Sequence, residues 1–84
     1  MKVGEIYTYG SKIIKIYYKI IKVYYDYYNE RISIKVNRLE LTSNNRIIIS
    51  VECTGMELLE SNKNLKRASR KEWYKLIRRL NESG

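Results

Sequence analysis

A long run of β-branched and aromatic residues, from Lys12 to Tyr25, constrains the fold more than any other segment. Its sequence is KIIKIYYKIIKVYY, and Ile, Val and Tyr favour strands. Apolar residues occupy alternate positions in two successive phases, Ile14, Ile16, Tyr18 and Ile20 followed by Ile21, Val23 and Tyr25. Because side chains of a strand alternate with a period of two, a change of phase needs a bulge or a bend. We therefore predict a strand over 12–25 that bends strongly near Ile20.

The same run has a second interpretation, as an amphipathic helix. Its polar residues fall within an arc of roughly 80° on a helical wheel: Lys12, Lys15, Lys19, Lys22 and Asp26. Against a helix, nearly every other position is β-branched or aromatic, and both types are weak helix formers. No acidic capping partner follows Ser11. We favour the strand and keep the helix as the alternative, on which the number of strands in the sheet depends.

The rest of the N-terminal two thirds also reads as strands separated by turns. Turn signals stand at Gly10-Ser11 and at Ser43-Asn44-Asn45, where Asn tolerates a positive φ. A phase shift in the alternation of 31–41 predicts a second bulge, near Asn37-Arg38. The segment 56–59 fits either a short edge strand or a single helical turn. The remaining predicted strands cover about 4–9, 31–41 and 46–53.

The C-terminal segment carries the clearest helix signal. Ser69, with Glu72 three residues later, forms a capping-box pattern. Apolar residues then recur at i, i+3, i+4 and i+7, as Trp73, Leu76, Ile77 and Leu80. On a helical wheel they fill an arc of about 100°, which is the width of a stripe that faces a core. We predict a helix over about 69–81 that buries Trp73 and presents its opposite side to solvent, with a frayed end from Asn81 to Gly84.

This order of elements, strands first and one helix last, predicts an α+β fold. We expect a single domain over 1–84, in which a strongly bent antiparallel sheet of four to five strands, SH3-like or barrel-like, is packed by the C-terminal helix. At 84 residues the core must be small. The helix is expected to contribute Trp73 and Leu76 to it. From the sheet we expect Ile14, Ile16, Ile32, Ile34, Val36, Ile47, Ile49 and Val51 in the core, with Cys53 also facing inward.

Three pairs of adjacent tyrosines raise the question of exposed rings. They are Tyr17-Tyr18, Tyr24-Tyr25 and Tyr27-Tyr28. Neighbouring side chains of a strand point to opposite faces, so we expect one ring of each pair to be exposed. Such rings, beside Lys15, Lys19 and Lys22, fit either an ordinary sheet surface or a stacking platform.

Positive charge is concentrated in residues 63–79. This segment has eight Lys or Arg against one acid, Glu72, and therefore carries +7 of the chain's net charge of +8. A merely solvated helix tends to alternate Glu with Lys, whereas a cluster of one sign indicates a polyanionic partner. A solvated face that aids solubility is the alternative. The candidate binding residues are Lys63, Lys66, Arg67, Arg70, Lys71, Tyr74, Lys75, Arg78 and Arg79.

We expect these residues to contact the nucleic-acid backbone non-specifically, because their helix face has no Asn or Gln to read bases. Tyr74 is a candidate for stacking on a base or sugar. The alternative is a protein-directed module, such as a phage-type inhibitor or regulator of a host protein with an acidic groove. A homo-oligomer through exposed strand edges, the long Tyr-rich strand among them, is a third hypothesis. A membrane-surface role is not expected, because the core needs the helix's narrow apolar arc.

Residues for catalysis and metal binding are scarce. The chain has no His, its nine acids show neither paired-carboxylate nor metal-ligand spacing, and no Gly-rich phosphate loop is present. We therefore expect no enzymatic activity, no cofactor and no metal. Cys53 is the only cysteine, which fits a reducing compartment or an inert buried thiol. With no recognisable signal peptide and no long uncharged segment, a cytoplasmic location is expected.

The opening Val3-Gly4-Glu5-Ile6-Tyr7, followed by a short turn and a β-rich run, resembles the start of small SH3-like barrel proteins of phage and low-GC bacteria. The resemblance covers these five residues and the general order of strands. It implies an SH3-like barrel and a binding function directed at nucleic acid or at protein. A shared fold alone does not decide between these two partners.

Overall fold

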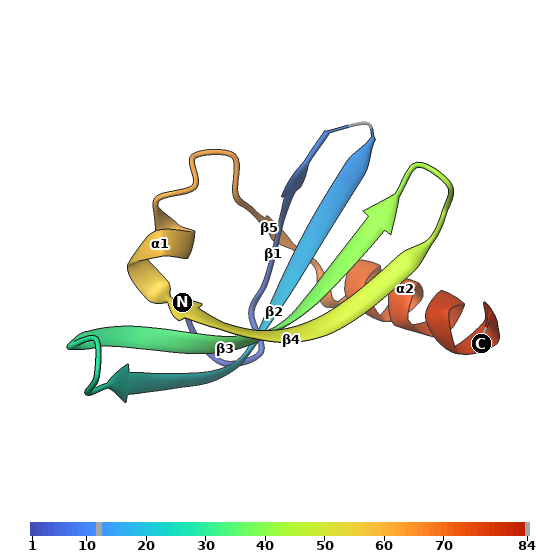
Figure 1. Cartoon of the computed structure of the whole chain (residues 1–84). Coiled ribbons are helices and arrows are strands. Elements are labelled where there is room, and N and C mark those ends of the chain that lie inside the picture. The colour runs from blue at the N-terminus through green and yellow to red at the C-terminus, as the bar shows by residue number, and fades with distance from the viewer. Residues whose placement is uncertain (12, 84) are drawn as a thin grey trace.

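The computed structural model describes residues 1–11 and 13–83 (Figure 1). Its five strands form one antiparallel sheet in the order β4-β3-β2-β1-β5. The order of elements is β1 (Ile6–Gly10), β2 (Ile14–Asp26), β3 (Arg31–Thr42), β4 (Ile47–Gly55), α1 (Met56–Glu60), β5 (Lys66–Ala68) and α2 (Arg70–Ser83). The fold is α+β, as predicted, and the strongly bent sheet is open rather than closed.

The run that begins at Lys12 forms a strand and not a helix, although Lys12 itself lies outside the described residues. β2 pairs with β1 along one edge and with β3 along the other. Its register with β3 shifts between Ile20 and Lys22, which confirms the bulge predicted near Ile20. Beyond the shift Val23 lies opposite Ile34, as Ile20 lies opposite Val36. The bulge thus keeps both apolar phases of the run on one face of the sheet.

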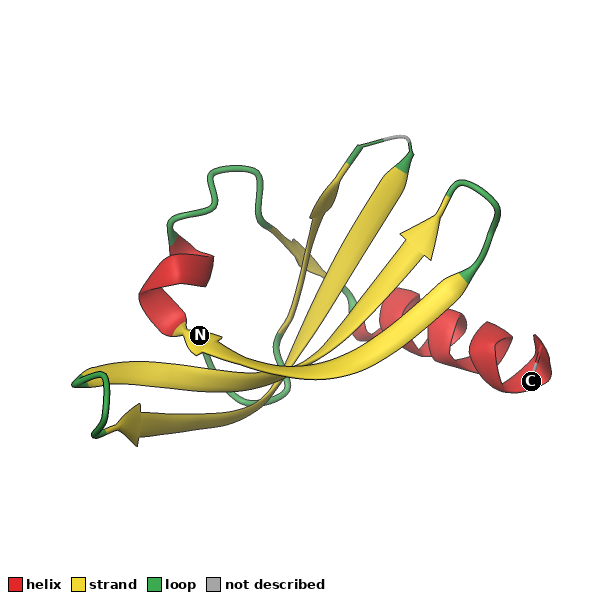
Figure 2. Ribbon diagram, in the orientation of Figure 1, coloured by secondary structure: helices red, strands yellow, loops and turns green. Residues whose placement is uncertain are grey.

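The sheet has one hydrophobic cluster on each face, and a different helix contributes to each cluster. Figure 2 shows the two helices, α1 and α2, at separate places along the sheet. We call the two surfaces the α1 face and the α2 face. On the α1 face the buried cluster comprises Ile16, Tyr18, Ile20, Ile34, Val36 and Leu59. On the α2 face it comprises Ile6, Tyr17, Leu39, Trp73 and Leu76. The faces are distinct because neighbours in β2, such as Tyr17 and Tyr18, belong to different clusters.

The second bulge, predicted near Asn37-Arg38, is wrong. β3 keeps an unbroken register with β2 and β4 through these residues. The phase shift arises instead because β3 contributes Val36 to the cluster on the α1 face and Leu39 to the cluster on the α2 face. The same arrangement buries both Tyr17 and Tyr18, although one ring of that pair was expected to be exposed.

The prediction of which sheet residues form the core is also wrong in part. Ile16, Ile34 and Val36 are buried and Ile47 is half-buried. Exposed instead are Ile14, Ile32, Ile49, Val51 and Cys53. For Ile49, Val51 and Cys53 the physical reason is the position of β4, an edge strand that neither helix covers along its length. The apolar residues at alternate positions of β4 therefore do not mark a buried face of this strand. Ile14 and Ile32 are exposed at the starts of β2 and β3, next to the hairpin turns.

The turns agree better with the sequence. Asn45 has the positive φ (60°) expected of the β3–β4 turn, and its N–H donates to the Thr42 carbonyl oxygen (3.0 Å). Of the two alternatives for 56–59, the helical turn is correct, since α1 spans Met56–Glu60. β5 was not foreseen. Its three residues pair with β1 and lead directly into α2.

Candidate functional site

Helix α2 is oriented by its cap and its buried side. The Ser69 hydroxyl accepts a hydrogen bond from the backbone N–H of Glu72 (3.1 Å), as the capping pattern predicted. Burial in β2 raises the pKa of the Tyr17 hydroxyl, and its interaction with the Glu72 carboxylate raises that pKa further. Trp73, only 2% exposed, packs against the same face of the sheet.

With Trp73 and Leu76 buried, the opposite side of α2 faces solvent. All six positions predicted for that side are exposed: Arg70, Lys71, Tyr74, Lys75, Arg78 and Arg79. Lys71, Lys75 and Arg78 line a shallow hollow around the Tyr74 ring. The helix therefore presents closely spaced cations around one aromatic ring.

A contact between Lys19 and Tyr74 joins this helix surface to the sheet. The Lys19 ammonium donates a hydrogen bond to the Tyr74 hydroxyl (3.1 Å), and its nitrogen lies 5.0 Å from the ring centroid. Lys19 lies on the α2 face, since it pairs with Ile6 of that face. The contact holds the half-exposed ring but leaves the charge of Lys19 without an acidic partner among the described residues.

Beyond Lys19, two more lysines continue along the α2 face. Lys22 and Lys35 are directly opposite each other in the β2–β3 ladder, and both are exposed. Like charges placed directly opposite each other destabilise a sheet. The Lys22 nitrogen lies 5.6 Å from the centroid of the Tyr24 ring, which is an aromatic contact and not an ion pair. We define the cationic strip as Lys19, Lys22 and Lys35 of the sheet with Arg70, Lys71, Tyr74, Lys75 and Arg78 of α2.

Ion pairs among the described residues of the sheet are confined to the α1 face. Arg38 pairs with Glu40 (3.6 Å) and with Glu52 (3.9 Å). All three of these residues are in register with side chains of the α1 face, such as Tyr18 and Val36. The third ion pair, between Arg67 and Glu5, lies on the same side.

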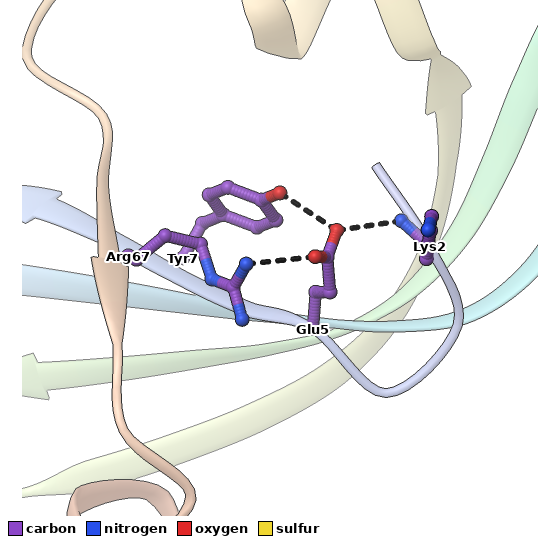
Figure 3. A network of polar contacts seen from close by, with 4 residues as sticks. All are labelled: Lys2, Glu5, Tyr7 and Arg67. Carbon is purple, nitrogen blue, oxygen red and sulfur yellow. Dashed lines mark hydrogen bonds and ion pairs between the residues drawn. The ribbon is translucent and has the colours of Figure 1, made fainter.

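The Arg67–Glu5 pair belongs to a small network (Figure 3). The Arg67 guanidinium lies 2.7 Å from one Glu5 oxygen, while the Tyr7 hydroxyl and the Lys2 backbone N–H donate to the other. The bond from Tyr7, followed by that from Lys2, lowers the pKa of Glu5. The Arg67 guanidinium also lies 5.4 Å from the centroid of the Tyr7 ring, on the α1 face. Arg67 is therefore compensated by a carboxylate and separated from the cationic strip.

The other two predicted residues that precede α2 also lie apart from the strip. Lys63 is exposed in the loop between α1 and β5. Lys66 lies on the α2 face, where it lines a cleft near Lys15 at the β1–β2 hairpin. Arg79 is exposed on α2. The structure thus places six of the nine predicted residues on one side of α2, and five of them belong to the cationic strip as defined above, namely Arg70, Lys71, Tyr74, Lys75 and Arg78.

The sheet contribution to this surface was only partly predicted. The sequence indicated Lys19 and Lys22 as neighbours of exposed tyrosines, but it did not connect them with the helix, and Lys35 was missed. A usable signal was present, because Lys35 stands between two core residues, Ile34 and Val36, and must face the other way.

The described part of the chain shows neither a metal site nor a membrane-spanning helix. Within it, no group of three or more Cys, Asp or Glu side chains is arranged to hold a metal ion. Neither α1 nor the described part of α2 combines the length and apolarity needed to cross a membrane. Comparison with protein-family models, curated proteins and solved structures gives no match to this chain.

Proposed function

We propose that this chain is a non-enzymatic module that binds the phosphate backbone of nucleic acid through the cationic strip. The observation that carries the proposal is the separation of charge between the two faces of the sheet. Arg38 and Arg67 form their ion pairs on the α1 face, whereas the lysines of the strip have no acidic partner within 4.0 Å among the described residues. Uncompensated cations set beside one another fit a ligand with repeated negative charge.

The geometry of the strip supports backbone contact rather than base reading. Side chains on one helix side are about 5–6 Å apart, so Lys71, Lys75 and Arg78 can reach successive phosphates. Lys22 and Lys35 extend the same charge along the sheet. Tyr74 is 51% exposed and its hydroxyl accepts a hydrogen bond from Lys19, and we expect its ring to stack on a base or sugar between the two sets of cations. We infer binding with little sequence preference.

Fluorescence anisotropy across a salt series tests the proposal, with labelled single-stranded and duplex DNA and RNA as probes. Each phosphate neutralised on a duplex contributes about 0.9 to the slope of log affinity against log salt concentration. We therefore expect a steep fall in affinity between low and moderate salt. Reversal of charge at Lys71 and at Arg78 should weaken binding to all probes alike and make the slope shallower.

The matched control is Lys2→Glu, which changes the net charge by the same amount at an exposed position outside the strip. If Lys2→Glu weakens binding as much as Lys71→Glu does, the strip is not the site. Affinity that hardly changes with salt would contradict phosphate binding altogether. Stoichiometric capture of one acidic protein, without binding to any nucleic-acid probe, would identify a protein-directed module instead.

A further inference from the structure

The two edges of the sheet differ in how well they are protected against pairing with another strand. β5, at one edge, has three residues, two of which are Lys66 and Arg67. Short, charged strands of this kind discourage further pairing. β4, at the other edge, has nine residues and contains no Pro, no Lys and no register shift against β3. The edge of β4 that faces away from β3 therefore offers a row of backbone groups for a further strand.

The side chains of β4 are also those of a strand that lacks a neighbour. Ile48 is 46% exposed, Ile49 41% and Val51 58%. These residues lie on both faces of the strand, in register with Glu40, Leu39 and Asn37 of β3. Apolar side chains on both faces of an edge strand lose part of their exposure when the side chains of another strand pack beside them. The long Tyr-rich strand, which the sequence had indicated for this role, is β2, in the centre of the sheet.

We propose that β4 pairs antiparallel with β4 of a second copy of this chain, about a two-fold axis at Ile49. Charge complementarity selects both the partner and the register. In this register Ile47 lies opposite Val51 of the other copy. Arg46, which directly precedes β4, comes opposite Glu52 once the pairing extends by one residue. Arg46 and Glu52 then form two symmetric pairs that flank an apolar centre. Opposite charges placed directly across two strands stabilise the pairing.

The dimer would form one continuous sheet of ten strands, because each copy contributes five. A two-fold axis normal to the sheet leaves the α2 faces of both copies on the same side. Both cationic strips would then face the same way, which would strengthen attachment to a long polyanion through two linked contacts. The dimer itself does not depend on nucleic-acid binding and is measured without it.

Sedimentation equilibrium of the full chain, up to millimolar concentration and without nucleic acid, tests the dimer. We expect a concentration-dependent dimer that Val51→Lys disrupts, whereas Ile13→Lys does not. Ile13 is a matched control, since it is 67% exposed and lies in the β1–β2 turn. Circular dichroism confirms that both variants are folded. A chain that stays monomeric throughout, or a dimer that Val51→Lys leaves intact, would overturn the proposal.

A change of charge at Arg46 tests the register. Arg46→Glu places like charges opposite each other at both pairs and should weaken the dimer about tenfold, whereas Arg46→Lys, which keeps a positive charge opposite Glu52, should not. A dimer that Arg46→Glu leaves unchanged would overturn the register and with it the proposed interface. Salt separates the two proposals, because apolar pairing of two cationic chains should persist in moderate salt while phosphate binding is lost.

Discussion

Lys35→Glu should stabilise the protein while it weakens binding, a combination that a cationic surface serving solubility alone would not produce. Lys35 is exposed and lies directly opposite Lys22. The substitution removes one like-charge contact and creates one opposite-charge contact. Each contribution is about 0.2–1 kcal/mol, so the free energy of unfolding should rise by about 0.5–1.5 kcal/mol. For a chain of this size each kcal/mol corresponds to a rise in Tm of about 4–8 °C.

Thermal unfolding followed by circular dichroism at low salt measures the first effect. The control is Lys63→Glu, an exposed loop residue, because it lowers the net charge equally without creating a cross-strand pair. Excess stabilisation of Lys35→Glu over this control should shrink in high salt, where exposed pairs are screened. Anisotropy should show weaker nucleic-acid binding and a salt slope that is shallower by about 0.9. If Lys35→Glu is no more stable than Lys63→Glu, the two lysines do not face each other across the β2–β3 ladder.

Three further predictions concern the fold that presents the strip. Trp73→Ala should lower the free energy of unfolding in urea by about 3–5 kcal/mol, because the ring is 2% exposed between α2 and the sheet; a much smaller loss would contradict that packing. The raised pKa of Tyr17 means that the neutral phenol stabilises the fold below pH about 10 and that this stabilisation is lost as the pH rises further. Tyr17→Phe should therefore make the urea midpoint of unfolding less dependent on pH in the alkaline range. An alkaline dependence that is the same in the variant would argue against this role of Tyr17. Gly10→Ala should reduce Tm, because φ at Gly10 is 146° and a Cβ there would meet the Ile14 carbonyl oxygen; an unaltered Tm would refute this strain.

Local patterns predicted the elements of this fold well. The bulge near Ile20, the β3–β4 turn and the cap at Ser69 each depend on residues within a few positions, so the sequence shows them directly. The apolar side of α2 was predicted for the same reason, since helical periodicity alone places Trp73 and Leu76 together.

The errors have a common origin in the layering of the sheet. A period of two tells which residues share a face but not whether that face is covered. At Tyr17 and Tyr18 both faces are covered, so both rings are buried. At Val51 neither face is covered, because β4 lies at an edge. Strand order depends on contacts between distant segments, and β5, which completes the other edge, has only three residues with no strand signal of their own.

The same layering explains why the sequence predicted only part of the candidate site. The charge count indicated residues 63–79 as the binding segment. In the structure Arg67 of this segment lies on the α1 face, and the cationic strip includes Lys19, Lys22 and Lys35 from strands far away in the chain. If the positive charge served solubility alone, nothing would favour gathering it on one face, and acids mixed among the lysines would stabilise the sheet. The chain instead places Glu40 and Glu52 across the sheet, where they pair with Arg38. A fold that forgoes available stabilising pairs on one face, while making them on the other, fits a surface whose anionic partner arrives from outside.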